Sequence, residues 1–388
     1  MGSLRTRSLV VRGVRLIPSP DVAPIVDCTI VVRDGRIASV GRDVPIPSDL
    51  EIIPGEGRVA TAGFWNAHIH FTEAIWKSAD RKPSRLLDQR LQEMLTSRGF
   101  TSVVDTGSDP RTTIPLRKRI ESGELRGPAI LTAGMGLYPP NGLPYYVRET
   151  LPFWIRPFLP CPSTPSEAMR IVKRNIARGA DLLKLFTGSY VARGEVNPMP
   201  LAIASAATSA AHSQGQLVFS HPSNLEGTSI AIRSGVDVLA HPPDSADGVD
   251  TSLIQQMIDR GMGMIPTLKM FATTVTSNPN YLGPIYDIVR KFHHAGGQLL
   301  FGTDVGFMSD YSTAEEYLAL EKSGVGSMSI LRMLTTAPAK RFGRGSGTIE
   351  VGAPGDMVLL GRDPTEDVTA FADVEGTFRA GRALYLRS

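Results

Sequence analysis

Cysteine is scarce in this sequence, and no hydrophobic run is long enough to cross a membrane. Cys28 and Cys161 are the only cysteines among 388 residues, too few for a disulfide framework and spaced unlike a metal knuckle. The N-terminal residues 1–17 alternate charged residues with short apolar steps, unlike the continuous apolar segment of a secretion signal. We therefore expect a soluble cytoplasmic protein with reduced thiols and no membrane contact.

An excess of charge of one sign is also missing. The 41 Lys and Arg residues against 38 Asp and Glu residues give a net charge of +3, and the basic residues are scattered along the chain. This distribution does not indicate a basic face for nucleic acid. We expect a small-molecule partner, no nucleic acid, and association of identical subunits into a homo-oligomer.

The two ends of the chain have a common texture. Both contain short Val- and Ile-rich segments separated by Gly, Asp or Pro turns, and these segments are residues 8–17, 28–41, 50–63, 347–364 and 374–388. Such segments are typical of short strands in a small antiparallel sheet. Residues 1–60 and 341–388 are therefore predicted to pair as the two parts of one small β-sandwich domain.

The middle of the chain, residues 61–340, follows a different pattern. Apolar strand segments alternate with helical stretches, which is typical of parallel α/β architecture. We count eight such segments: 63–71, 101–107, 128–134, 181–188, 216–222, 237–243, 263–268 and 298–304. Eight strands of this kind predict an α/β fold with a (β/α)8 TIM-like barrel of ordinary size.

Polar side chains with metal-binding or ionisable groups fall on or at the ends of these strand segments. They are His68, His70, Lys184, His221, His241 and Asp304. In barrels of this class the C-terminal strand ends carry the chemistry, so the six side chains are expected to converge. Because side chains alternate along a strand, His68 and His70 are expected to point to the same side.

Imidazoles and a carboxylate are the ligands expected for zinc and similar divalent ions. Such an ion turns water into a nucleophile at neutral pH. A lone histidine at a strand end is more often a hydrogen-bonded core or surface residue, so the joint pattern carries the prediction. We expect packing, capping or solvent roles for the other histidines, which are His212, His293 and His294.

With these residues in place, the chain resembles the amidohydrolase superfamily over nearly its whole length. The resemblance rests on the His-x-His of strand 1, the Lys of strand 4, the histidines of strands 5 and 6, and "GTDVG" on strand 8. Within the superfamily, the runs "GADLLKLFTGS" and "GTIEVGAPGDMVLLGRDP" are similar to those of imidazolonepropionase-like and prolidase-like members.

The resemblance implies a binuclear metal centre with a carboxylated lysine. Lys184 matches the lysine that reacts with carbon dioxide in binuclear members, and the resulting carbamate bridges two metal ions. A protonated ammonium beside two cations would be repelled, whereas a buried lysine can lose its charge and react. Alternatively, Lys184 pairs with a carboxylate or lines the barrel with its stem. Zinc is the expected metal, with manganese, iron, cobalt or nickel left open.

The implied function is a metal-dependent hydrolase that cleaves a C–N bond of an amide, a cyclic amide or a peptide-like compound other than a typical peptide bond. We assign His68, His70 and Asp304 to one ion, and His221 and His241 to the other. A metal-bridging hydroxide attacks the carbonyl, and Asp304 is the catalytic residue that transfers the proton to the leaving nitrogen. Two alternatives stay open: the same site could run a dehydrative cyclisation or a deamination, or the chain could be a non-enzymatic relative.

A proline-rich aromatic stretch, residues 138–165, follows the third strand segment. Long loops at a barrel mouth commonly build the walls of a binding site, which favours an aromatic substrate. Equally, the rings could pack on the barrel or on a neighbouring subunit. A second stretch, residues 269–292, could supply another wall, with Lys269 and Tyr281 as polar contacts.

Overall fold

The computed structural model describes residues 8–275 and 280–387. Residues 1–7 of the first predicted domain and residues 276–279 of the second predicted wall therefore lie outside the described residues. Among the helices of the described part, none is both long and apolar enough to cross a membrane.

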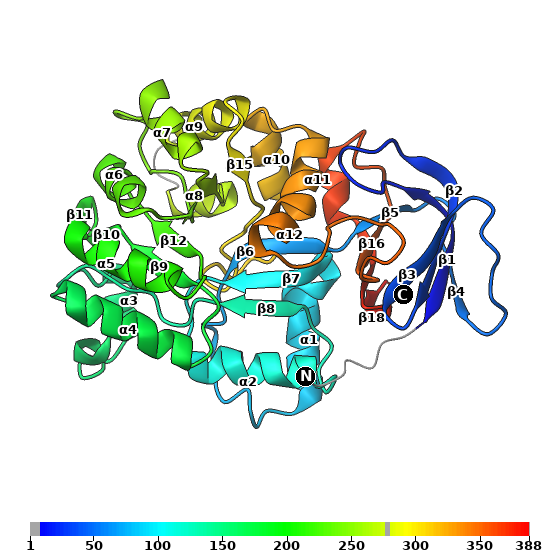
Figure 1. Ribbon diagram of the computed structural model, residues 1–388, viewed down its shortest axis with the longest axis horizontal. Helices are drawn as coiled ribbons and strands as arrows, with labels where there is room; N and C mark the ends of the chain where they lie inside the picture. The colour runs from blue at the N-terminus through cyan, green and yellow to red at the C-terminus, as the bar shows by residue number, and fades with distance from the viewer. Residues whose placement is uncertain (1–7, 276–279, 388) are drawn as a thin grey trace.

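Both ends of the chain contribute strands to one eight-stranded sheet. The order is β18-β17-β16-β5-β1-β2-β3, with β4 also paired to β1. The strands are β1 (Leu9–Leu16), β2 (Ile25–Arg33), β3 (Arg36–Gly41), β4 (Glu51–Pro54), β5 (Val59–Ala62), β16 (Met357–Leu360), β17 (Val374–Arg379) and β18 (Arg382–Leu386). β16 runs antiparallel to β5 with Met357 opposite Ala62, so strands from the two ends lie side by side, as the sequence predicts (Figure 1).

The sheet is mixed: most of its strand pairs are antiparallel, as predicted, but the prediction was wrong for β4 and β5. β4 and β5 both run parallel to β1, with Leu9 opposite Glu51 and Arg15 opposite Val59. β1, β2 and β3 form an antiparallel meander. Residues 42–50 then return the chain to β1, on the side opposite β2. β4 and β5 consequently run in the direction of β1 instead of continuing the meander.

The middle of the chain forms two parallel sheets, β6-β7-β8 and β15-β14-β13-β12-β9. Their strands are β6 (Phe64–Ile69), β7 (Phe100–Asp105), β8 (Ala129–Thr132), β9 (Leu183–Phe186), β12 (Val218–His221), β13 (Val238–Leu239), β14 (Gly263–Met264) and β15 (Gln298–Leu299). Each of the eight predicted segments overlaps one of these strands, which confirms the α/β class. A short antiparallel hairpin, β10 (Gly188–Ala192) and β11 (Glu195–Pro198), follows β9.

Twelve helices in the described part connect and cover these strands (Figure 1). They are α1 (Ser84–Met94), α2 (Pro110–Glu121), α3 (Tyr145–Thr150), α4 (Pro165–Ala177), α5 (Leu201–His212), α6 (Leu225–Ser234), α7 (Thr251–Asp259), α8 (Leu268–Thr274), α9 (Leu282–His294), α10 (Ala314–Lys322), α11 (Ser327–Leu334) and α12 (Thr336–Phe342). Side-chain caps fix several starts: Asp109 accepts from the amide of Arg111, and Asn224 accepts from that of Gly227.

Backbone hydrogen bonds join the two parallel sheets on both sides. On one side, the amide of Ala67 donates to Phe301 O at 2.7 Å and that of Asp304 donates to His68 O at 2.9 Å. On the other, the amide of Leu137 donates to Lys184 O at 2.9 Å. Because parallel strands end at the same edge, these bonds bring the C-terminal ends of distant strands together.

Candidate metal centre

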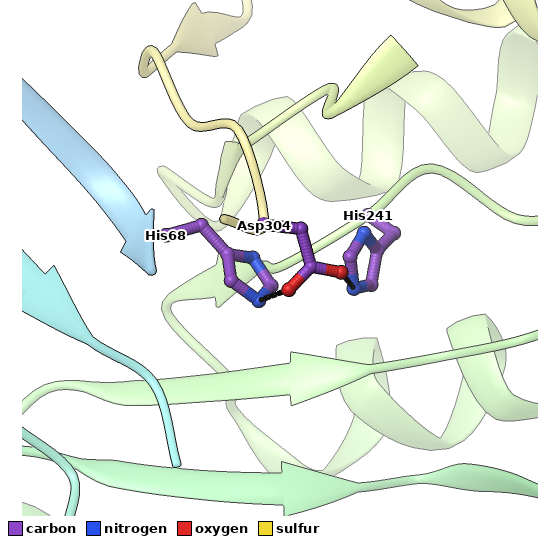
Figure 2. Close-up of side chains that lie close together, drawn as sticks. All are labelled: His68, His241 and Asp304. Atoms are coloured by element: carbon purple, nitrogen blue, oxygen red, sulfur yellow. Dashed lines mark ion pairs between the residues drawn. The ribbon is translucent and has the colours of Figure 1, made fainter. Parts of the chain in front are cut away.

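The six side chains predicted for the site come from five strands and gather at the C-terminal edge of the parallel strands. Asp304 lies between the imidazoles of His68 and His241 (Figure 2). The Nε2 atoms of His68 and His70 are 3.3 Å and 3.0 Å from Asp304 Oδ1, and His241 Nε2 is 3.9 Å from Asp304 Oδ2. Three of the predicted histidines therefore share the Asp304 carboxylate.

His221 and Lys184 lie beside this group. The ring centroids of His221 and His241 are 4.7 Å apart, the same as those of His68 and His241. The Lys184 side chain is 2% exposed, and its Nζ lies 5.6 Å from the ring of Phe186, which stacks on His221 at 5.1 Å. The structure thus brings all six predicted residues together.

Hydrogen bonds to Nδ1 fix the orientation of three imidazoles. His68 Nδ1 lies 3.0 Å from Ala240 O, and His70 Nδ1 lies 2.8 Å from Gly107 O. Because a carbonyl oxygen only accepts, each Nδ1 carries the hydrogen and each Nε2 offers a lone pair. His241 Nδ1 lies 2.6 Å from the hydroxyl of Thr267, which donates to Pro266 O, so His241 is held in the same tautomer.

An unusual backbone conformation places Asp304. The residue has a φ of 57°, in the left-handed region that non-glycine residues seldom adopt. Gly306, two residues later, has a φ of 97°, and a Cβ there would lie 1.8 Å from the carbonyl oxygen of His70. The turn therefore requires glycine at position 306, and it directs the Asp304 carboxylate back over the end of β6.

Burial keeps most of these groups in the neutral form that binds metals. Desolvation lowers the pKa of His221 to about 3 and lowers the pKa values of His68 and His241 well below the usual range. Burial likewise lowers the pKa of Lys184 to about 7, with the Asp304 charge opposing the shift. A lysine of this kind is neutral for an appreciable part of the time at neutral pH.

For Asp304 and His70, their mutual interaction opposes the effect of burial on each pKa. Burial favours the neutral carboxyl, but the interactions with the neighbouring imidazoles of His68 and His70 outweigh it and lower the pKa of Asp304. For His70, burial lowers the pKa and the Asp304 carboxylate raises it, with a net rise. The carboxylate therefore attracts positive charge to the point where the imidazoles meet.

The donor set fits a divalent cation. Asp304 Oδ1 is buried and accepts no well-aligned hydrogen bond from any described residue, although two Nε2 atoms lie within 3.3 Å of it. Lone pairs on nitrogen and oxygen that face one another repel unless a cation lies between them. Imidazole nitrogens and a carboxylate are the ligands of zinc and related ions.

The remaining predicted residues lie elsewhere or have other partners. His212 Nε2 is 2.9 Å from Asp237 Oδ2, and His293 and His294 lie in the last turn of α9, outside the site. Lys269 is 5% exposed and binds Asp310 at 2.6 Å, so it links α8 to the loop that precedes α10. The Lys269 side chain is therefore engaged with acidic residues, and a substrate contact for it is not favoured.

The aromatic stretch divides into a packed part and an exposed part. The ring of Tyr138 lies 4.6 Å from that of Phe186, and the ring of Tyr146 lies 5.5 Å from that of Phe307, which follows Asp304. In contrast, Phe153, Trp154 and Phe158 are 72%, 62% and 83% exposed. Only the packed part reaches the C-terminal edge of the strands, and an aromatic substrate stays a prediction.

Two supporting residues were missed by the sequence reasoning. Thr267 orients His241, and the buried carboxylate of Asp105 accepts hydrogen bonds from Ser108, Thr113 and Thr132 behind His70. Each lies at or just beyond the end of a strand segment, in "GMIPTL" and "TSVVDTG". A polar residue at such a position was the available signal, but the pattern does not separate a hydrogen-bond partner from a ligand.

Comparison with known proteins agrees with this geometry. The model of the amidohydrolase family matches residues 59–384. Because this match spans most of the chain, the protein belongs to the amidohydrolase family.

Solved structures of similar fold extend over nearly the whole chain. A Xaa-Pro dipeptidase with bound methionine is 23% identical, with a TM-score of 0.84 over 97% of this chain and 99% of its own. A putative prolidase from Bifidobacterium longum is 23% identical, with a TM-score of 0.81 over 97% and 94% of the two chains. Ochratoxinase from A. niger is 20% identical, with a TM-score of 0.79 over 98% and 96%. At these identities the likeness concerns the fold.

Proposed function

We propose that this protein is a metal-dependent amidohydrolase that cleaves the C–N bond of an amide, a cyclic amide or a peptide-like small molecule. The observation that carries the proposal is the convergence of four imidazoles, Asp304 and a buried lysine, with three imidazoles held so that Nε2 faces the carboxylate. Membership in the amidohydrolase family and the hydrolytic names of the similar structures support it.

The proposed architecture places this site at the mouth of a (β/α)8 barrel. The hydrogen bonds that join the two parallel sheets on both sides support closure of the eight strands. Residues 61–340 form the barrel domain, and residues 1–60 with 341–388 form the β-sandwich domain. In such barrels active sites lie at the C-terminal strand ends.

Five of the six residues would divide between two divalent ions, with zinc as the expected metal. His68, His70 and Asp304 would hold one ion, and His221 and His241 would hold the other. When bound, divalent ions at such a site lower the pKa of water and polarise a carbonyl oxygen. Asp304 accepts the proton of the attacking water and donates it to the leaving nitrogen.

Lys184 is proposed to form a carbamate, which would act as a further ligand for both ions. Its neutral amine adds to carbon dioxide, forming an N–C bond and releasing one proton, which changes a neutral side chain into an anionic one. Burial favours the neutral amine, because it lowers the pKa of Lys184 to about 7. The carbamate adds the negative charge that four neutral imidazoles and one carboxylate lack for two divalent ions.

The test compares metal content and activity in matched lysine variants. Lys184→Ala should lose most of its zinc and at least about a hundredfold of kcat on N-acyl anilides, and added acetate or propionate should restore part of both. Lys269→Ala is the control: it also removes a buried lysine, but one paired with Asp310 and Glu315, so short carboxylates should have no effect on it. Full activity of zinc-depleted protein, or of Lys184→Ala without added carboxylate, contradicts the proposal.

A further inference from the structure

A second polar cluster lies beside the metal centre. Tyr190 of the hairpin β10–β11 donates its hydroxyl hydrogen to Asp244 Oδ2 at 2.5 Å. Asp244 comes three residues after His241, and its amide donates at 2.8 Å to the carbonyl of Ser223, two residues after His221. The Ser223 hydroxyl donates to Gly188 O in the same hairpin. The cluster therefore rests on the segments that follow three strands of the metal centre.

The Asp244 carboxylate contacts Tyr190 and acts electrostatically on two further tyrosines. The negative charge of Asp244 contributes, after burial, to the raised pKa values of Tyr146, Tyr190 and Tyr281. Asp304 acts on Tyr146 as well. Tyr146 is thus close enough to feel both carboxylates, and it connects the cluster to the metal centre. Asp244 and these three tyrosines are each partly exposed.

One oxygen of the Asp244 carboxylate is available as a hydrogen-bond acceptor. Oδ2 accepts from the Tyr190 hydroxyl, and none of the described residues donates a hydrogen bond to Oδ1. Burial raises the pKa of Asp244 to about 7, and the Tyr190 hydrogen bond opposes the rise. A carboxylate desolvated to this extent gains from a cation or an N–H donor, and tyrosine faces attract cations.

We propose that Asp244, held by Tyr190, binds a protonated amine or another N–H donor of the substrate, and that the enzyme discriminates against substrates with a free carboxylate at this position. The proposal rests on the proposed function, and Asp244 is its specificity-determining residue. An α-carboxylate would meet the Asp244 charge, with repulsion in place of binding.

A nearby arginine offers an alternative mode of substrate recognition. Arg148 of α3 is exposed and donates from Nη2 to the carbonyl of Val191, the residue after Tyr190. A guanidinium released from this bond could bind a carboxylate. If Arg148 governs recognition, anionic compounds are preferred and Arg148→Ala removes the preference.

The test measures binding in the absence of metal, so that it does not depend on hydrolysis. Full-length zinc-depleted protein at pH 8, where Asp244 is ionised, is titrated with benzylamine and with phenylacetate by ligand-observed NMR. We expect benzylamine to bind at least about tenfold more tightly. Asp244→Asn should weaken benzylamine binding by about tenfold or more, while Asp247→Asn, which removes an exposed charge from the same loop, should leave it in place.

Tyr190→Phe separates recognition from a structural role. This variant removes the internal donor but keeps the carboxylate, so the preference for benzylamine should persist. Equal binding of phenylacetate, an equal effect of Asp244→Asn and Asp247→Asn, a loss in Tyr190→Phe equal to that in Asp244→Asn, or a carboxylate preference removed by Arg148→Ala each overturns the proposal. If instead benzylamine binding depends on Asp244 while no amide is hydrolysed, the proposed function fails and the recognition site stands.

Discussion

Thr267 combines a strained backbone with a hydrogen bond to the metal-centre residue His241. Its φ of 47° and ψ of 45° lie in the left-handed region, which a β-branched residue rarely adopts. The side chain is fully buried, and its hydroxyl accepts from His241 Nδ1 at 2.6 Å while donating to Pro266 O at 2.7 Å. Strain of this kind persists where surrounding contacts fix it, and here these contacts include a metal-centre residue.

Replacement of Thr267 by valine should weaken metal binding specifically. Valine keeps the shape and the β-branch, so the backbone strain is unchanged and only the hydroxyl is lost. Partners of this type contribute roughly 10- to 100-fold to metal affinity, and we expect a loss in that range when zinc is measured by competition with a chromophoric chelator. Thr267→Ser keeps the hydroxyl and should stay near the parent affinity; equal losses in both variants would show that the hydroxyl has no such role.

At the residue scale, spacing along the sequence predicts the residues of the metal centre but not the groups that hold them in place. His68, His70, Lys184, His221, His241 and Asp304 could be selected because residue types with metal chemistry recur at strand ends, and parallel strands share an edge. The anchors of these residues could not be selected in that way. Ala240 and Gly107 act through their backbone carbonyls, which any residue type carries. The φ of 57° at Asp304 likewise has no signature in a single sequence.

At the scale of elements, strand positions were predicted better than strand lengths. The segment 263–268 was expected as one strand, but β14 contains only Gly263–Met264. Pro266 has no amide hydrogen for a ladder, and Thr267 turns the chain into α8. Apolar composition marks where a buried strand lies, whereas its end is set by hydrogen-bond partners that the sequence does not reveal.

A buried carboxylate joins two helices near the same turn. Glu316 of α10 is 1% exposed, and its Oε2 accepts from the amide of Lys269 in the first turn of α8 at 2.7 Å. Its Oε1 is buried without a hydrogen-bond partner among the described residues. Burial therefore raises the pKa of Glu316 to about 7, and the amides of Lys269 and Leu268 only partly offset the shift.

Glu316→Gln should flatten the pH dependence of stability. Because the folded-state pKa lies above the unfolded value of 4.5, the native state binds the extra proton between these two values. The stabilisation is complete below about pH 4.5 and is lost as the pH rises through about 7. Glutamine resembles the protonated acid, so its free energy of unfolding relative to the parent should rise from pH 5 to pH 8, by on the order of 3 kcal/mol.

Urea unfolding at the two pH values provides the measurement. Glu315→Gln is the matched control, because Glu315 precedes Glu316 on α10 but is 58% exposed and pairs with Lys269 at 3.0 Å. It should not gain stability between pH 5 and pH 8. A gain of the same size in both variants would contradict the assignment of the effect to the buried carboxylate.

For the whole molecule, the pairing of the two chain ends was predictable and the strand directions were not. The similar composition of residues 50–63 and 347–364 indicated that they share a sheet, and β5 and β16 do pair. The parallel direction of β4 and β5 depends on how residues 42–50 return the chain, which composition does not encode. The connection between this sheet and the α/β part likewise depends on single polar contacts, such as the Thr377 hydroxyl that donates to Thr96 O at 2.7 Å.

Arg379 provides the contact by which this connection can be tested. It is 8% exposed on β17, donates from Nη2 to Glu121 at the end of α2 at 2.8 Å, and donates from Nη1 to Gly127 O at 3.3 Å. Its charge also opposes the rise that burial causes in the pKa of Asp356. Arg379→Met should therefore lower the free energy of unfolding by about 2–4 kcal/mol, since it leaves polar groups without their partner.

Arg387→Met removes an arginine from the same sheet, but that arginine is 43% exposed and pairs with Asp373 and Glu375 at the surface. Such pairs contribute at most about 1 kcal/mol, so urea unfolding should separate the two variants clearly. Similar small effects in both would mean that Arg379 does not hold the sheet to α2, and that other contacts between the two parts determine how firmly they are joined.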